Sequence, residues 1–450
     1  MVELGLKNYR RFQKLMPLKL GGVSFFVGEN NAGKSSFSKA LMLTLNNLHN
    51  KMRPNEYMRV IPEYLFYFEA DNMHNFSSTF FRELNQCAKN EIIEFKINAE
   101  DDFIFYPEKS GETTKRHVDF TIAIGVAKGE NEEQSSGKVN YVTIMDNVRH
   151  IELCFNHMRS TVKFSDSNRQ DISWATCMDN PNMNYIVNLV YTLICYSDNQ
   201  TVRERRDLLE GLCSDLSALI DSMSFEYIYS HSVFPHVCYL AEDKNDYMAR
   251  TIHEFCRAEI DKNSEAALFV RKWMRIFKIG EDFEIEPYAG VLYRFYIIEG
   301  GKKMDLAEKG MGTAQLMTLL LRLGYDIHKY NGYHAKPIII IEEPEQNLHP
   351  ALQGQLADLF VQLNEVYGFK IIIETHSEYM IREAQVIVAE NYCSEESLSD
   401  CPLKVFYFPK EGDPYDMVFQ SDGRFVKMFG SGFFNVAALS AIKLNKLEGR

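Results

Sequence analysis

The hydrophobic pattern divides the chain into regions with different predicted secondary structure. Residues 1–50 read as two strands, a glycine loop and a helix. Residues 90–165 read as short strands, because apolar residues there alternate with polar ones at a period of two. The clearest of these runs are Val118, Phe120, Ile122, Ile124 and Val126, and later Ile151, Leu153 and Phe155. Charged or glycine-containing stretches separate the runs, so we expect an antiparallel meander.

Residues 180–280 have mainly helical spacing. Thr201 and Glu204 have the spacing of a capping box at a helix start. The helix behind them is expected to bury one stripe, made of Leu208, Leu212, Leu216, Leu219 and Met223. Two further helices are predicted at 246–260 and 264–277, the second ended by Gly280.

Strands return near residue 283, where Val291, Tyr293, Phe295 and Ile297 recur at every second position. The last third then alternates helix and strand, which is typical of an α/β parallel sheet. We therefore expect an N-terminal lobe at 1–165, a mainly helical insertion at 166–280, and a C-terminal lobe at 281–450 that includes a tail after Ser431. Because the strongest motifs lie near the two ends, the insertion must bring both lobes into one domain.

A complete phosphate-binding motif follows the apolar run Val23–Val27. The segment Gly28–Ser36 reads GENNAGKSS and matches GxxxxGK[ST] in full. In this motif the glycines let backbone N–H groups face phosphates, and the following helix adds the positive end of its dipole. Lys34 is expected to reach the β- and γ-phosphates, and the Ser35 hydroxyl to bind Mg²⁺. The predicted nucleotide-binding residues are Gly28, Asn30, Asn31, Gly33, Lys34, Ser35 and Ser36. The alternative, a glycine turn that merely packs, fits the flanking strand and helix less well.

The second candidate functional motif is a pair of acidic residues at the end of a predicted strand. Four isoleucines, Ile338–Ile341, predict a strand buried on both faces, and Glu342 and Glu343 follow it. Ligands bind at the carboxyl ends of such strands. We expect Glu342 to hold Mg²⁺ through water and Glu343 to polarise the attacking water. The next predicted strand, 370–374, leads to His376, which would touch the γ-phosphate; the alternative is a structural histidine.

These motifs together resemble ATP-binding-cassette-type ATPases of the branch that includes SMC, RecF and OLD-family proteins. Within it, the sequence is most similar to the AAA-family ATPase subunits of bacterial anti-phage defence systems such as PARIS and Septu. The resemblance covers 1–50 and about 280–390. Leu6–Phe12 resembles the first strand, Pro344–His349 the D-loop and His376 the switch histidine, while Glu342 stands where aspartate is more usual.

The resemblance implies an α/β P-loop ATPase head of the ABC type, with an antiparallel β subdomain and a helical insertion. It also implies a homodimer or higher homo-oligomer around ATP and Mg²⁺, and a separate protein effector, a nuclease or toxin. The segment Leu306–Gln315, which precedes a predicted helix with Leu316, Leu319 and Leu320, resembles the signature that contacts the γ-phosphate of the opposite subunit. The predicted signature residues within it are Gly310, Gly312 and Thr313.

Composition and the remaining motifs argue against several other classes of protein. The net charge of −13 argues against a surface built for non-specific nucleic-acid binding, although it leaves room for a local basic groove. The nine cysteines include no CxxC pair, and the longest apolar stretches are shorter than a membrane span, so a cytoplasmic protein is expected. No nuclease is expected, because Asp413 and Asp416 read as a hairpin turn. Two alternatives stay open: a RecF-like DNA-binding repair factor, and a non-hydrolysing scaffold with bound ATP.

Overall fold

A computed structural model describes most of the chain. The described residues are 2–49, 63–65, 67–68, 71–72, 92–105, 114–127, 136–156, 160–166, 168–172, 185–229, 235–241, 243, 246–288, 291–333 and 335–430. The chain divides into two compact units. Unit 1 contains Met1–Leu20 and Gly33–Phe225, and unit 2 contains Gly21–Ala32 and Glu226–Arg450.

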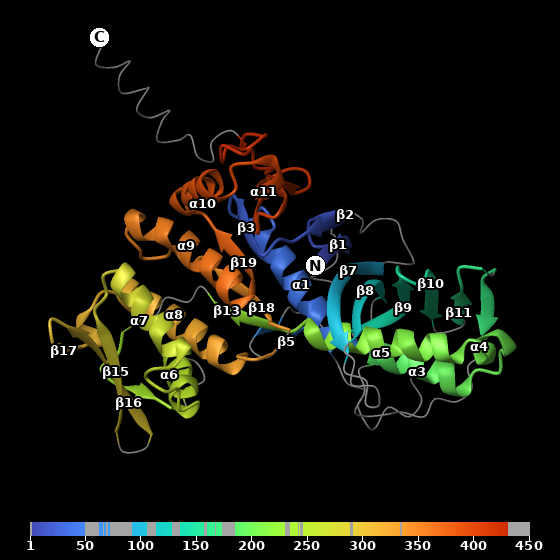
Figure 1. Cartoon of the computed structure of the whole chain (residues 1–450), viewed down its shortest axis with the longest axis horizontal. Helices are drawn as coiled ribbons and strands as arrows, with labels where there is room; N and C mark the ends of the chain where they lie inside the picture. Colours follow the sequence, from blue (N-terminus) through green and yellow to red (C-terminus); the bar gives the residue numbers. More distant parts are fainter. Residues whose placement is uncertain are drawn as a thin grey trace, which may run out of the picture. The chain divides into compact units, whose positions relative to one another are not determined.

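An antiparallel sheet forms the framework of unit 1 (Figure 1). Among the described residues its strand order is β12-β11-β10-β9-β8-β7-β1-β2, and β4 pairs with β9. The strands are β1 (Val2–Tyr9), β2 (Phe12–Lys19), β4 (Glu63–Leu65), β7 (Ile92–Phe105), β8 (Thr114–Ala127), β9 (Ser136–Asp146), β10 (Ile151–Asn156), β11 (Ser160–Lys163) and β12 (Gln170–Ile172). From β7 to β12 each strand pairs antiparallel with the next, which confirms the predicted meander. The alternating apolar residues of β8 are all buried, as their period of two requires. A short hairpin, β5 (Tyr67–Phe68) and β6 (Asp71–Asn72), pairs separately.

The helices of unit 1 are α1 (Lys34–Leu48), α3 (Tyr185–Tyr196), α4 (Gln200–Glu204) and α5 (Arg206–Ser222). The predicted capping box is wrong: α4 begins two residues earlier than it implies, and its N-cap is Asn199, whose side chain accepts from the N–H groups of Thr201 and Val202. Asparagine is at least as good an N-cap residue as threonine, so the sequence offers two possible N-caps, and the helix uses Asn199. The predicted stripe is shifted at its start, because Leu208 is 39% exposed and Leu209 is buried.

A mainly parallel sheet lies at the centre of unit 2. Its order is β13-β18-β19-β3-β20-β21, with strands β13 (Phe225–Ile228), β18 (Ile338–Glu342), β19 (Lys370–Thr375), β3 (Val23–Gly28), β20 (Leu403–Phe408) and β21 (Tyr415–Asp416). The four strands β18, β19, β3 and β20 run parallel, which confirms the α/β expectation for the last third. Asp413 lies between β20 and β21, which pair antiparallel, so the hairpin expected there is also confirmed.

The rest of unit 2 is mixed. Its helices are α6 (Tyr247–Arg257), α7 (Glu265–Ile276), α8 (Met311–Lys329), α9 (Pro350–Tyr367), α10 (Glu378–Asn391) and α11 (Glu395–Ser399), with a 3₁₀ turn η2 (Leu306–Glu308). A smaller sheet contains β14 (Tyr239–Leu240), β15 (Asp282–Tyr288), β16 (Leu292–Glu299) and β17 (Lys302–Asp305). Gly368 ends α9 with a φ of 75°, but Gly280 does not end α7, where Lys278 takes the left-handed conformation instead. Val291 precedes β16 and is exposed.

The fold class is confirmed as mixed α/β with a large antiparallel sheet and helices. The boundaries at residues 165 and 280 stay predictions, and the tail 431–450 lies outside the described residues. In the part of the chain that the structure describes, no helix combines the length and the apolar character needed to cross a membrane.

Candidate functional site

The predicted phosphate loop leaves the central sheet of unit 2 at the end of β3. Every residue of β3 is buried between β19 and β20. Gly28 ends the strand against the β20 backbone, where a Cβ atom would lie 2.3 Å from the carbonyl oxygen of Phe408. Only glycine fits such a close approach, so packing against β20 requires the first glycine of the motif.

In unit 1 the motif continues into α1. Gly33 is the N-cap residue with a φ of 95°, Lys34 is the first helical residue, and no acidic side chain lies in the first turn. The first N–H groups of a helix have no intrahelical partner, and the helix dipole makes this end favourable for an anion. The predicted strand, loop and helix are therefore present in this order.

Two arginines of the β1–β2 turn lie beside this helix start in unit 1. Arg10 Nη1 is 3.4 Å from Ser36 Oγ. A Cβ atom on Gly33 would come within 2.5 Å of Arg11 Cδ. Sequence reasoning treated this segment only as a first-strand pattern, although two adjacent cations beside a phosphate-loop helix are a usable signal.

The acidic pair lies at the same edge of the unit 2 sheet as Gly28. In the parallel register Glu342 is opposite Glu374, and Thr375 is opposite Val27, so β18, β19 and β3 end side by side (Figure 1). Glu342 is half-buried, and within the described residues its carboxylate has no hydrogen-bond or ion-pair partner. Serine hydroxyl and carboxylate oxygens are hard donors of the kind Mg²⁺ prefers, so Ser35 and Glu342 fit the predicted metal chemically.

Glu343 and His376 come together as predicted. His376 Nε2 is 3.7 Å from Glu343 Oε1, and about a third of each side chain is exposed. Glu343 has a φ of 39°, and its N–H donates to Glu374 O over 2.7 Å, which holds this strained residue at the strand end. Gln346 Nε2 donates to the other carboxylate oxygen, Glu343 Oε2. The carboxylate is thus oriented from two sides, an arrangement suited to a general base.

A third acidic residue, Glu345, is hydrogen-bonded to the segment that carries His376. It is only 8% exposed, and its Oε1 accepts from Thr375 Oγ1 at 2.8 Å and from the His376 N–H at 2.7 Å. Burial raises the pKa of Glu345 above its usual value, although these hydrogen bonds oppose the shift. Glu345 therefore ties the segment after β18 to the end of β19, where His376 lies.

The predicted signature residues lie at the start of α8. Gly310 is the N-cap residue, and Thr313 N donates back to Gly310 O over 3.0 Å. Gly312 packs against the segment after β18, where a Cβ atom would be 2.5 Å from Asn347 O. Gln315 Oε1 also accepts from Asn347 Nδ2 at 3.2 Å. Packing within its own chain therefore explains why residue 312 is a glycine. A contact of this loop with a second subunit stays a prediction.

The sequence matches the family model described as "AAA ATPase domain" over residues 1–381. This chain belongs to the AAA ATPase domain family. Membership supports the binding and hydrolysis of ATP by this AAA ATPase domain, and Mg²⁺ typically accompanies the nucleotide. The roles assigned to individual residues stay predictions.

Solved structures similar to this AAA ATPase domain include SMC heads. A SmcHead bound to the C-winged helix domain of ScpA is 12% identical, with a TM-score of 0.41 over 90% of this chain and 93% of its own. The Smc head domain with an extended coiled coil, bound to the C-terminal domain of ScpA and derived from Pyrococcus furiosus, is 11% identical, with a TM-score of 0.39 over 100% of both chains. The SMC head domain from Thermotoga maritima is 10% identical, with a TM-score of 0.34 over 90% and 93%. No curated protein matches the sequence significantly.

Sequence reasoning missed the supporting residues of this AAA ATPase domain. Glu345 and Gln346 follow the acidic pair after one proline, but nothing in their spacing shows that one holds His376 and the other Glu343. The available signal was a third acid within four residues of a buried strand, which is costly to bury without a partner.

Proposed function

We propose that this protein is an ATPase that dimerises around ATP and uses hydrolysis to control a separate effector protein. Lys34 and the N–H groups of the phosphate loop would bind the phosphates, and Ser35 and Glu342 would hold Mg²⁺, which neutralises phosphate charge when bound. Glu343 would orient and deprotonate the attacking water, and His376 would contact the γ-phosphate. Gly310, Gly312 and Thr313 would complete the site of the partner subunit.

One observation carries the proposal: the approach of Glu343 to His376 at the sheet edge where β3 passes into the phosphate loop. A carboxylate held by Gln346 on one oxygen and facing a histidine on the other suits proton abstraction from water. The family match over residues 1–381 supports the same reaction.

ATP turnover by purified parent and Glu343→Gln proteins tests the proposal, with native mass recorded in each nucleotide state. We expect Glu343→Gln to bind ATP, to lose about 10²- to 10⁴-fold in turnover, and to accumulate as an ATP-bound assembly. Lys34→Ala should lose nucleotide binding. Glu378→Gln is the matched control, because Glu378 is an acid of the same unit that pairs with Arg382 on α10.

Parental turnover in Glu343→Gln would refute the assignment of the base. Tight ATP binding and a stable assembly without turnover in the parent would identify the non-hydrolysing scaffold instead. Salt-sensitive DNA binding that requires ATP would identify the RecF-like alternative.

The effector and the anti-phage role extend the proposal by resemblance. Infection of cells that carry the parental gene with its neighbouring genes tests this role. We expect phage plating to be reduced by the parent and restored by Lys34→Ala. Equal plating on both strains would remove the defence role and leave the ATPase proposal intact.

A further inference from the structure

A group of metal-ligating side chains lies on the outward face of the unit 1 sheet, on β7 and β8. In the antiparallel register Glu100 is opposite Asp119, and Asp102 is opposite His117. Their neighbours Ala99, Val118 and Phe120 are buried on the other face. The period of two therefore projects these four polar side chains from the same face as a two-by-two block.

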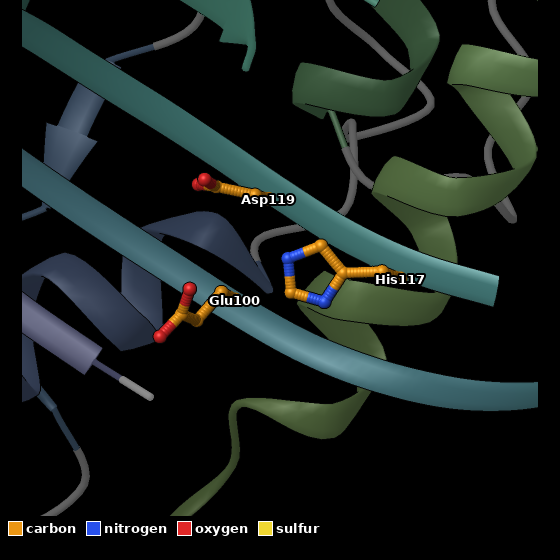
Figure 2. A group of neighbouring side chains, drawn as sticks. All are labelled: Glu100, His117 and Asp119. Carbon is orange, nitrogen blue, oxygen red and sulfur yellow. The ribbon is translucent and has the colours of Figure 1, made fainter. Parts of the chain in front are cut away.

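Three of the four side chains converge on one point. One ligand atom each of Glu100, His117 and Asp119 lies within 4.8 Å of the others. Figure 2 shows the outer ring nitrogen of His117 pointing toward both carboxylates. Among the described residues this is the one group of three such side chains. Two carboxylates and one imidazole form a mixed donor set that would balance the charge of a divalent cation.

The residues around the group orient these donors. Asp102 Oδ1 lies 2.9 Å from His117 Nδ1, so a proton on Nδ1 leaves Nε2 as the acceptor that faces Glu100 and Asp119. Asn147 Nδ2 donates to Asp119 Oδ1 over 2.7 Å. A carboxylate behind a ligating histidine and a hydrogen bond to a ligating carboxylate are the usual supports of a metal ligand set.

A small cavity adjoins the group. It has a volume of about 200 Å³, and Glu100 and Asp119 form part of its wall. Lys19 also lines it, opposed by Glu3, its cross-strand partner. The cavity has room for several water molecules, which would complete a coordination sphere that has only three protein ligands.

We propose that Glu100, His117 and Asp119 bind a divalent first-row transition ion, with Zn²⁺ as the first ion to test. The imidazole favours such an ion over Mg²⁺ or Ca²⁺, which prefer sets made of oxygen alone. The ion joins β7 to β8 on the face of unit 1 and keeps open positions toward the cavity. This site is separate from the predicted Mg²⁺ ligands Ser35 and Glu342.

Competition of the full-length protein against a chromophoric Zn²⁺ chelator, without nucleotide, tests the proposal. We expect the parent to bind one tight equivalent, and Glu100→Gln and His117→Ala to lose it. Asp102→Asn should retain it with about 10- to 100-fold weaker affinity, because it weakens the support of His117 and removes the ion pair with Lys115 but leaves all three ligands in place. Asp101→Asn is the matched control, since it removes the same charge from the neighbouring position of β7, outside the ligand group.

Two further measurements keep the outcome decisive. Co²⁺ bound to the parent should show d–d absorption without a thiolate-to-metal band, which excludes the free cysteines as ligands. Glu342→Gln should keep the equivalent, which separates this site from the ATPase proposal. Equal Zn²⁺ affinity in the parent and in the near-isosteric Glu100→Gln variant would overturn the inference, as would a parent that binds no tight equivalent.

Discussion

At the scale of single residues, Glu345 connects two parts of the candidate site. It follows the predicted water-activating Glu343 by two positions, yet its carboxylate is buried and is bonded to Thr375 and to the backbone of His376. A buried acid with such bonds acts as a positioning group, because it fixes where His376 lies relative to Glu343.

We predict that Glu345→Ala lowers both stability and turnover. Loss of the carboxylate leaves the Thr375 hydroxyl and the His376 N–H without their acceptor, at a cost of about 1–3 kcal/mol. The melting temperature should fall, and kcat for ATP should fall more than the KM changes. Glu345→Gln keeps one acceptor oxygen and should recover part of both losses. A variant with reduced stability and parental kcat would show that Glu345 has only a structural role.

At the scale of elements, α8 contains a buried ionic group that connects it to α6 and β13. Arg322 Nη2 is bonded to Glu226 at 2.6 Å, Arg322 Nη1 also contacts Glu254 Oε2, and Arg322 Nε is 3.4 Å from Asp326. Burial raises the pKa of Asp326 to about 7, against the lowering effect of Arg322. The predicted signature residues start this same helix, so the group also anchors them.

We predict a pH-dependent stability that Asp326→Asn removes. The folded pKa lies above the usual 3.8, so the stabilisation from proton binding is complete below about 3.8 and is lost as pH rises through about 7. A difference of one pH unit between the folded and unfolded pKa corresponds to about 1.4 kcal/mol of stability. The melting temperature of the parent should therefore fall relative to Asp326→Asn between about pH 4 and pH 7.

Glu411→Gln is the control for this measurement, because it changes the charge at an exposed position of the same unit. A constant difference between Asp326→Asn and the parent across this pH range would contradict the raised pKa.

At the scale of the whole molecule, the proposed dimer can be tested with two glycines of one loop. A Cβ atom on Gly310 would meet nothing within 4 Å among the residues that the structure describes, whereas one on Gly312 would collide with Asn347 O. The two positions therefore separate a contact to another subunit from a contact within the chain.

We predict that Gly310→Ala keeps the fold and impairs ATP-dependent assembly, while Gly312→Ala lowers the melting temperature of the isolated chain. The cap change at Gly310 costs at most about 1 kcal/mol. Native mass with ATP and thermal unfolding without it are the two readouts. Parental assembly and turnover in Gly310→Ala would place this loop outside the dimer contact.

Local sequence patterns predicted much of the fold. The alternation in β8, the isoleucine run of β18, and the strand, loop and helix around Gly28–Ser36 all depend on neighbours within a few residues. Such signals succeed because burial on one or both faces imposes a period directly on the sequence. The cap of α4 was misplaced because Asn199 and Thr201 both fit a cap, and only backbone geometry chooses between them.

The sequence by itself determined the chemistry of the phosphate loop and the acidic strand end, because each is a contiguous motif whose residue types are required by the ligand. Tertiary structure alone decided that Glu345 holds His376, that Gly312 packs on Asn347, and that Glu100 on β7 approaches His117 on β8. These pairs are 17 to 35 residues apart or depend on strand register, and a register shift of one residue would turn each β7 side chain to the opposite face.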